Sequence, residues 1–263
     1  MIITKTPFRI SFFGGGTDHP LWFKEHGGKV LATTFDKYCY ISLRQLPPFF
    51  DHKYRIVYSQ IENIININEI KHPAVKEVLN YFHSNEGLEI HHDGDLPARS
   101  GLGSSSSFTV GLINAMNALQ GKYCSPYELA STAIHVEQDL IKESVGSQDQ
   151  TIAAFGGFNL IEFNKLRTFQ VQEMLISEER LKSLEENLIL CFTGFSRTAE
   201  KIAKSQIEST PFKEKELNTM VEITKMAKEI ITNNKISLDE LGKLLNEQWL
   251  IKKSLTKYIS NQA

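Results

Sequence analysis

A run of glycines and serines directly before a predicted helix is the stretch of this sequence best suited to chemistry. Its residues are Gly101, Leu102, Gly103, Ser104, Ser105, Ser106 and Ser107. Glycines let successive backbone N–H groups point at one spot, and a helix N-terminus adds the positive end of its dipole. Serine hydroxyls beside those groups can bind phosphate oxygens or a magnesium ion. The stretch predicts a phosphate-binding site; a flexible loop whose serine caps the helix is the alternative.

The spacing of these residues excludes three other glycine-containing loops. No Gly-Lys-Ser or Gly-Lys-Thr follows, as it would in the phosphate loop of P-loop NTPases. The third glycine of the dinucleotide-binding fingerprint is missing after Gly103. The Gly-x-Ser-x-Gly turn of hydrolases is also absent from the stretch.

One carboxylate lies on the apolar face of the next predicted helix. Glu137 falls in the middle of a stripe that recurs at about 100° per residue and consists of Ala130, Ala133, Ile134, Leu140 and Ile141. Burial of a carboxylate is costly unless a cation or hydrogen bonds compensate. Glu137 is therefore predicted either to bind magnesium or to form a buried ion pair with an arginine or lysine.

A second carboxylate, Asp149, follows a glycine turn in the sequence Val-Gly-Ser-Gln-Asp-Gln at 145–150. A side chain just after such a turn is well placed to point into a cleft. The alternative is an aspartate that only caps a turn or a helix.

Hydrophobic periodicity predicts the elements that position these residues. Strands are expected at 2–11, 30–34, 38–43, 54–58, 87–92, 158–163 and 188–193, and helices at 73–83, 108–119, 125–143, 198–209, 214–233 and 238–260. Strands and helices mix up to about residue 165, whereas one strand and several helices follow. We place a domain boundary there, giving domains 1–165 and 166–263.

Composition limits the class of protein. The chain has 263 residues, 41% of them hydrophobic, and a formal net charge of −2, which argues against a general nucleic-acid binder. No apolar run approaches the roughly 20 residues that span a bilayer, and the N-terminus does not resemble a secretory signal. Three cysteines lie far apart without metal-binding spacing. We expect a cytoplasmic protein with no nucleic-acid or membrane partner and predict no particular oligomeric state.

Several stretches resemble motifs of the GHMP kinases, the group named for galactokinase, homoserine kinase, mevalonate kinase and phosphomevalonate kinase. Residues 97–107 match every fixed position of the second motif, Pro-x-x-x-Gly-Leu-Gly-Ser-Ser. Residues 7–9, Pro-Phe-Arg, and 14–18, Gly-Gly-Gly-Thr-Asp, resemble the first motif in its sugar-kinase variant. Glu137 and Asp149 fall where the family keeps a magnesium carboxylate and a catalytic aspartate. The resemblance spans residues 1 to about 165.

The resemblance implies a role for each of these residues. The glycine–serine stretch would hold the phosphates of ATP, and Ser105 would bind Mg²⁺ together with Glu137. Asp149 would act as base or orient the attacking hydroxyl, while Arg9 would support that aspartate and the transferring phosphoryl group. These roles fit phosphoryl transfer, which is mostly positioning and neutralisation of charge. Asp18 would bind sugar hydroxyls, and further substrate contacts are expected from Gly16, Thr17 and Gln148.

Within the family, residues 14–18 and 146–150 look most like the kinases of D-glycero-D-manno-heptose 7-phosphate. The resemblance implies ATP-dependent phosphorylation of the anomeric hydroxyl to the 1,7-bisphosphate, in nucleotide-heptose synthesis. A phosphorylated sugar needs a cation, and we expect Arg197, at the start of a predicted helix, to supply it; a surface arginine is the alternative. A kinase of a free sugar such as fucose or galactose, and a non-catalytic protein that binds sugar and ATP, remain rival functions.

The fold that the resemblance implies is a two-domain α+β fold. Its N-terminal domain would resemble ribosomal protein S5, and its C-terminal domain would be ferredoxin-like but incomplete. The family's third, glycine-rich motif is not found, since only Gly194 and Gly242 follow Gly157. We therefore expect the sequence to be a truncated form of a protein some tens of residues longer.

Overall fold

The structure, a computed structural model, describes residues 1–98, 100–191, 199–256 and 259–260. The chain forms two compact units: unit 1 consists of residues 1–9, 34–143 and 149–156, and unit 2 consists of residues 10–33, 144–148 and 157–263. Neither unit is continuous, because the long strands β1 (Ile2–Phe13) and β2 (Gly28–Gln45) each contribute to both. The division into domains 1–165 and 166–263 stays a prediction.

The strands of unit 1 form a sheet with an apolar face. The second half of β2 pairs antiparallel with β5 (Leu88–Gly94), β5 pairs parallel with β3 (Tyr54–Val57), and β3 pairs antiparallel with β4 (Ile61–Ile64). Alternate residues of β2 are fully buried, as the two-residue period of a strand requires: Cys39, Ile41 and Leu43. This apolar face needs a cover.

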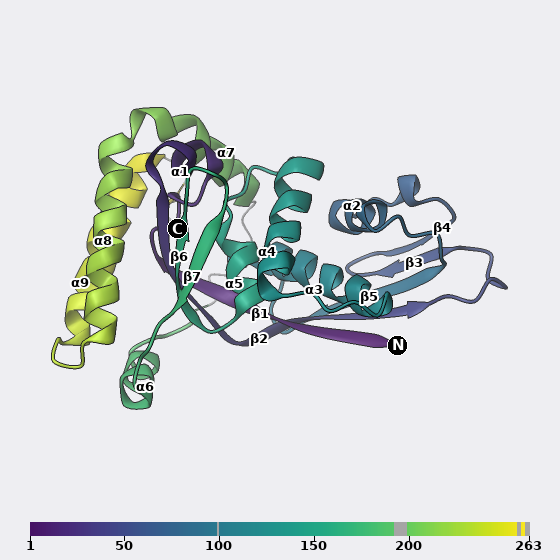
Figure 1. Ribbon diagram of the computed structural model, residues 1–263, viewed down its shortest axis with the longest axis horizontal. Helices are drawn as coiled ribbons and strands as arrows, with labels where there is room; N and C mark the ends of the chain where they lie inside the picture. The colour runs from purple at the N-terminus through teal and green to yellow at the C-terminus, as the bar shows by residue number, and fades with distance from the viewer. Residues whose placement is uncertain (99, 192–198, 257–258, 261–263) are drawn as a thin grey trace. The chain divides into compact units, whose positions relative to one another are not determined.

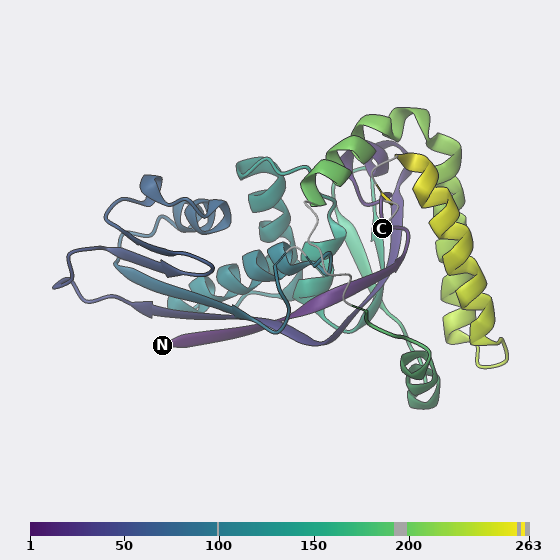
Figure 2. The same ribbon diagram turned by 180° about the vertical axis from the view of Figure 1, so that it is seen from behind.

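Helices supply that cover in unit 1. They are η1 (Ile67–Glu69), α2 (Pro73–Tyr81), α3 (Ser104–Leu119), α4 (Pro126–His135), the π-helical turn η2 (Val136–Leu140) and α5 (Gln148–Phe155). Figures 1 and 2 show α2 and α3 alongside β3 and β5. Leu79 of α2 and Leu112 of α3 join Ile41 and Ile90 of the strands in one hydrophobic core. This core holds the start of α3, where the glycine–serine stretch ends.

Unit 2 has its own core, and its strands belong to the same seven-stranded sheet as those of unit 1. The first half of β2 pairs antiparallel with β6 (Phe158–Phe163), which pairs with β7 (Phe169–Glu173). The helices are α1 (Pro20–His26), α6 (Glu178–Glu186), α7 (Ala199–Ser209), η3 (Thr210–Phe212), α8 (Glu214–Thr232) and α9 (Leu238–Leu255). Helices α8 and α9 lie side by side in both views (Figures 1 and 2). Their apolar residues, among them Ile223 and Leu241, pack with Phe13 and Leu31.

Several predicted elements need correction. Residues 188–191 form no strand, and 192–193 lie outside the described residues. Their apolar side chains are largely exposed, at 42% for Leu188 and 87% for Ile189, so no buried face stabilises a strand there. The strands expected at 30–34 and 38–43 are one strand, and the last helix ends at Leu255 rather than 260.

The core of unit 1 makes a stability prediction. Leu112 is fully buried, so Leu112→Ala leaves a cavity and is expected to lower the free energy of unfolding by about 2–5 kcal/mol. The matched control, Leu166→Ala, removes a leucine that is 84% exposed and is expected to change little. Urea titrations followed by circular dichroism compare the two. Equal midpoints for both variants would contradict the described core.

Candidate active site

An arginine–aspartate pair anchors the first cluster of predicted site residues, which lies in unit 1. Arg9 of β1 donates from Nε to Oδ1 of Asp149 at 2.7 Å and from Nη2 to Oδ2 at 2.5 Å. Its third nitrogen, Nη1, donates to the carbonyl oxygen of Gly101 at 2.8 Å. The two-pronged contact fixes the carboxylate and sets its distance from the glycine loop. Asp149 lies in the first turn of α5, three residues after Gly146.

The glycine loop owes its shape to its sequence. Gly101 and Gly103 have positive φ angles of +80° and +79°, which residues other than glycine rarely adopt. A methyl group on Gly103 would lie 2.9 Å from Cγ of Arg9, so glycine also lets the arginine approach. The backbone N–H of Arg9 donates to the carbonyl of Leu102 at 3.1 Å and ties the loop to β1.

The start of α3 is suited to an anion. Gly103 is the N-cap and provides no side-chain cap, and the first backbone bond of the helix runs from Ser107 N–H to the Gly103 carbonyl at 2.9 Å. The N–H groups of the preceding serines therefore have no intrahelical acceptor. With the dipole of a 16-residue helix behind them, they can hold phosphate oxygens.

Glu137 is buried, as the apolar stripe predicts, with only 1% of its surface exposed. Its Oε2 accepts hydrogen bonds from Ser106 Oγ at 2.9 Å and from Gln150 Nε2. Its Oε1 is buried and has no hydrogen-bond partner, and no Lys or Arg among the described residues forms an ion pair with it. Burial raises the pKa of Glu137 to about 7. A buried carboxylate oxygen without a hydrogen-bond partner, beside the glycine–serine stretch, fits a ligand of a divalent cation better than the ion pair, and the magnesium role stays a prediction.

The structure pairs Glu137 with a different serine from the one expected. Ser106 is buried against Glu137, whereas Ser105, expected as the magnesium partner, is exposed. One residue along a helix turns a side chain by about 100°, so only one of two consecutive serines can point toward Glu137. The role of Ser105 as a metal ligand stays a prediction.

The second cluster of predicted site residues lies in unit 2, around Gly14–Asp18. The carboxylate of Asp18 is 1% exposed and accepts from the backbone N–H of Gly16 at 2.8 Å and of Gln148 at 3.2 Å. Thr17 is also buried, and its hydroxyl donates to the carbonyl oxygens of Gly14 and Lys29. Both side chains therefore hold the loop in shape, and contact with a sugar stays a prediction for each.

Two glutamines complete this second cluster. Ser11 Oγ donates to Oε1 of Gln148 at 2.5 Å. Gln248 of α9 accepts from Gly14 N–H at 2.7 Å and donates to the Phe12 carbonyl at 2.8 Å. Sequence reasoning missed Gln248; a polar residue buried in an amphipathic helix is the signal that it left. Arg197 lies outside the described residues.

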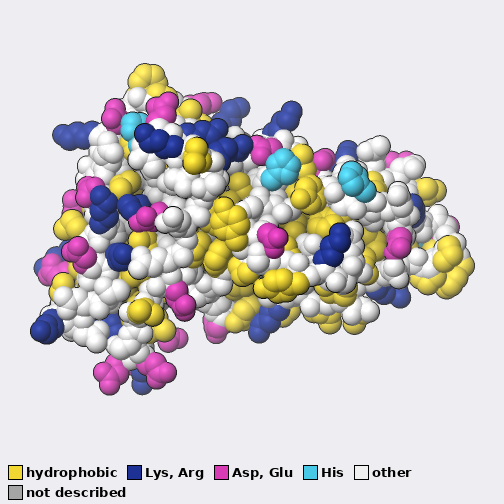
Figure 3. All heavy atoms as spheres, in the orientation of Figure 1, with side chains coloured by type: hydrophobic (Ala, Val, Ile, Leu, Met, Phe, Trp, Pro, Cys, Tyr) yellow, Lys and Arg dark blue, Asp and Glu magenta, His cyan; other side chains and the backbone are white. Residues whose placement is uncertain are grey.

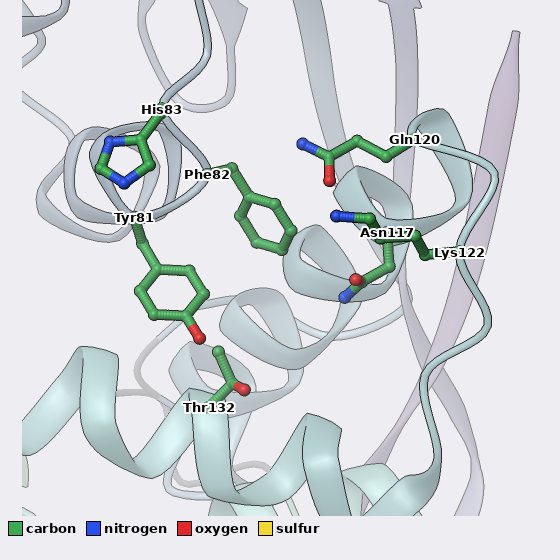
Figure 4. A pocket seen from close by; sticks show the side chains of 7 residues that line it. All are labelled: Tyr81, Phe82, His83, Asn117, Gln120, Lys122 and Thr132. Carbon is green, nitrogen blue, oxygen red and sulfur yellow. The ribbon is translucent and has the colours of Figure 1, made fainter.

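Other features of the described residues bear on the site. No group of three or more His, Cys, Asp or Glu side chains forms a metal centre there. A metal held by one carboxylate and substrate phosphates needs no such group. A pocket of about 340 Å³ lies where α2 and α3 end beside α4 and contains none of the predicted site residues (Figure 4). In the described chain, no helix is long and apolar enough to cross a membrane.

Comparison with known proteins places these features in a family. Residues 68–157, which include the glycine–serine stretch, Glu137 and Asp149, match the model of the GHMP kinases N terminal domain. The chain is 29% identical over 272 residues to the D-glycero-alpha-D-manno-heptose 7-phosphate kinase of Campylobacter jejuni, covering 99% of this chain and 79% of that protein. It is 24% identical to a bifunctional fucokinase/GDP-fucose pyrophosphorylase of Arabidopsis thaliana, covering 98% of this chain but 26% of that one.

A solved structure shows the same mixed α+β fold. The D-glycero-D-manno-heptose 1-phosphate kinase of Bacteroides thetaiotaomicron aligns with a TM-score of 0.78, covering 97% of this chain and 80% of that one, at 22% identity. The match to the domain model and the similarity to the heptose phosphate kinase, which covers nearly all of this chain, agree with each other. Residues 68–157 belong to the GHMP kinase family, and the chain is an ATP-dependent phosphotransferase that acts on an alcohol group.

Proposed function

We propose that the protein transfers the γ-phosphoryl group of ATP to the anomeric hydroxyl of D-glycero-D-manno-heptose 7-phosphate, giving the 1,7-bisphosphate for nucleotide-heptose synthesis. The observation that carries the proposal is the Arg9 fork, which holds Asp149 and the Gly101 carbonyl at once. Arg9 thus holds a carboxylate beside the glycine–serine stretch, which we propose binds the phosphates of ATP. A fixed base or orienting group next to bound phosphates is what phosphoryl transfer to a hydroxyl requires.

In this proposal each residue of the first cluster has one task. Asp149 orients the attacking hydroxyl and accepts its proton as the new O–P bond forms and ADP leaves. Arg9 keeps that carboxylate in place and, with the N–H groups at the start of α3, counters charge on the phosphoryl group. Glu137, with the neighbouring serines, would hold magnesium, which when bound offsets charge on the ATP phosphates.

The acceptor is assigned to the second cluster. Asp18, Gly16, Thr17 and Gln148 are proposed to bind the sugar, and Arg197 its phosphate. Gln148 and Asp149 are consecutive residues, so the proposed sugar contacts directly precede the base along the chain. The name of the Campylobacter jejuni relative supports a heptose phosphate as substrate. The sequence domains 1–165 and 166–263 stay part of the proposal.

A kinase of a free sugar is the second candidate. The similarity to a fucokinase, which also extends over nearly all of this chain, favours it. Its substrate would use the same base and the same phosphate loop but would need no cation for a second phosphate.

Steady-state assays of ADP release with a panel of acceptors test the proposal. The panel holds D-glycero-D-manno-heptose 7-phosphate, the unphosphorylated heptose, fucose and galactose. We expect kcat/KM for the phosphorylated heptose to exceed that for every free sugar by about tenfold or more, since a charged hydrogen bond contributes about 1.5–3 kcal/mol. Equal or better use of a free sugar would support the second candidate. Binding of ATP and sugar without turnover of any acceptor would support a non-catalytic sensor.

A further inference from the structure

A buried amide in the first turn of α5, that of Gln150, contacts the carboxylate of Glu137. Gln150 is 0% exposed and Glu137 is 1% exposed, and both belong to unit 1. Gln150 donates from Nε2 to Oε2 of Glu137, and Ser106 of α3 donates from Oγ to the same oxygen at 2.9 Å. Two donors from two helices therefore meet on one carboxylate oxygen and hold the whole group in place.

This arrangement leaves the other oxygen of Glu137 for a ligand. Because both donors bind Oε2, the oxygen without a hydrogen-bond partner in the described part of the chain is Oε1. The contact also fixes the direction of the Gln150 amide, since its own oxygen would repel the carboxylate. A glutamate side chain turns about three bonds, so donors that hold it in one rotamer reduce the entropy lost when a metal binds.

The far end of the same amide argues against a role in stability alone. Oε1 of Gln150 is buried and has no hydrogen-bond partner among the described residues. A buried acceptor without a donor costs stability, and native proteins contain few of them. Methionine has nearly the same volume and would avoid that cost, while Ser106 would still donate to Glu137. Packing therefore does not account for a glutamine at this position.

The chain connects this amide directly to the proposed base. Gln150 follows Asp149, whose two carboxylate oxygens accept from Nε and Nη2 of Arg9. The first turn of α5 thus carries both the proposed base and the amide that holds the proposed metal ligand. Residues that orient a metal ligand from behind commonly affect metal affinity nearly as much as the ligand itself.

We infer that Gln150 is a positioning residue, which holds Glu137 in the orientation that binds magnesium and acts through Glu137 alone. The inference rests on the magnesium role that the proposed function gives to Glu137. It adds the residue that prepares this carboxylate for the metal. Removal of the amide is expected to leave the glycine–serine stretch and the Arg9–Asp149 pair in place, because neither contacts the Gln150 side chain through a hydrogen bond in the described chain.

Binding of adenylyl imidodiphosphate, an ATP analogue that is not hydrolysed, measures the effect of the metal without turnover. Calorimetric titrations with saturating magnesium and with a chelator give the factor by which magnesium tightens binding of the analogue. We expect Gln150→Met to reduce this magnesium factor about tenfold, the lower end of the usual cost of losing a contact to a metal ligand. Binding without magnesium and the melting temperature are expected to stay unchanged.

Thr4→Val is the matched control, since it also removes a buried hydrogen bond of unit 1. Thr4 is 7% exposed, and its hydroxyl donates to the Gly111 carbonyl oxygen on α3 at 3.0 Å. The magnesium factor of this variant is expected to equal that of the unsubstituted protein. If Gln150→Met does not fold, Gln150→Asn replaces it: the amide is kept, but it is one methylene too short to reach Oε2, so the factor is again expected to fall.

Weak binding of magnesium to the protein surface gives the same background in every variant. The formal net charge is only −2. On the face drawn in Figure 3, Asp and Glu side chains lie interspersed with Lys and Arg side chains. Since Gln150→Met and Thr4→Val change no charge, a difference between them in the magnesium factor arises from the site.

A double substitution tests whether Gln150 acts through Glu137. Glu137→Gln is expected to lower the magnesium factor by itself, and the addition of Gln150→Met is then expected to change little, because residues in contact do not contribute additively. An unchanged factor in Gln150→Met, or a further tenfold loss in the double variant, would overturn the inference while Glu137 remains a metal ligand. A lower melting temperature with an unchanged factor would make Gln150 purely structural.

The same titrations separate the inference from the proposed function. An unchanged magnesium factor in Glu137→Gln would remove the metal ligand from the proposed function and would overturn the inference with it. The panel of acceptor sugars would still decide the substrate by itself. A panel that shows no turnover, together with a magnesium factor that both Glu137→Gln and Gln150→Met reduce, would refute the kinase reaction and support the positioning role.

Discussion

Asp149→Asn is expected to lower kcat by about 10²- to 10⁴-fold, the usual contribution of a general base. The asparagine keeps the size of the side chain and can still accept from Arg9, but it cannot take a proton from the acceptor hydroxyl. Because that transfer matters only in the transition state, the affinity for ATP is expected to change far less than kcat. Steady-state kinetics and a separate titration of ATP binding measure the two effects.

Two outcomes bear directly on the role of Asp149. Near-normal turnover with lost ATP binding would move the residue to the nucleotide site. A thermal melt controls for the partly buried ion pair with Arg9, since its loss could unfold the protein rather than stop the reaction. A variant that has the melting temperature of the unsubstituted protein but has lost turnover would establish the chemical role of Asp149.

Glu137→Gln is expected to cause the second large loss, together with a shift in the magnesium concentration that activity requires. Glutamine keeps the shape and can still contact Ser106 and Gln150, so the change mainly removes the charge of a side chain that is 1% exposed. Neutral amides are weaker ligands than carboxylates for magnesium, a hard cation. Rates measured across a magnesium titration test this.

The matched control is Asp139→Asn, on the same π-helical turn. Asp139 accepts from His135 at the surface and is not expected to affect magnesium dependence. Equal activity of Glu137→Gln and the unsubstituted protein at every magnesium concentration would contradict the ligand role. Lower stability with unchanged activity would make Glu137 a purely structural residue.

Local sequence predicted the features that depend on local geometry. The positive φ angles of Gly101 and Gly103 are what a glycine turn before a helix requires. The helix expected from residue 125 begins there, with Ser125 as the N-cap of α4. The predicted burial of Glu137 is confirmed, since only 1% of its surface is exposed. The prediction was possible because an apolar stripe shows which face of a helix turns inward. These signals need only neighbouring residues.

Other features depended on contacts that sequence spacing does not contain. Gln248 binds Gly14 across 234 residues, and no local pattern announces such a partner. Strand β7 was missed because it has only five residues and only two of them, Phe169 and Val171, are apolar, which is too short an alternation to predict a strand. The reverse error occurred near Ile189. An apolar run predicted a strand there, but its side chains are exposed and no other element among the described residues covers them.

We propose that this chain moves a phosphoryl group from ATP to a sugar hydroxyl and that the Arg9–Asp149 pair is required for the transfer. Phosphorus NMR of a reaction with ATP, magnesium and D-glycero-D-manno-heptose 7-phosphate tests it most directly. A new anomeric phosphate resonance is expected to grow in step with ADP and to be absent with Asp149→Asn. Release of inorganic phosphate with the heptose unchanged, or an equal yield of bisphosphate from Asp149→Asn, would contradict it.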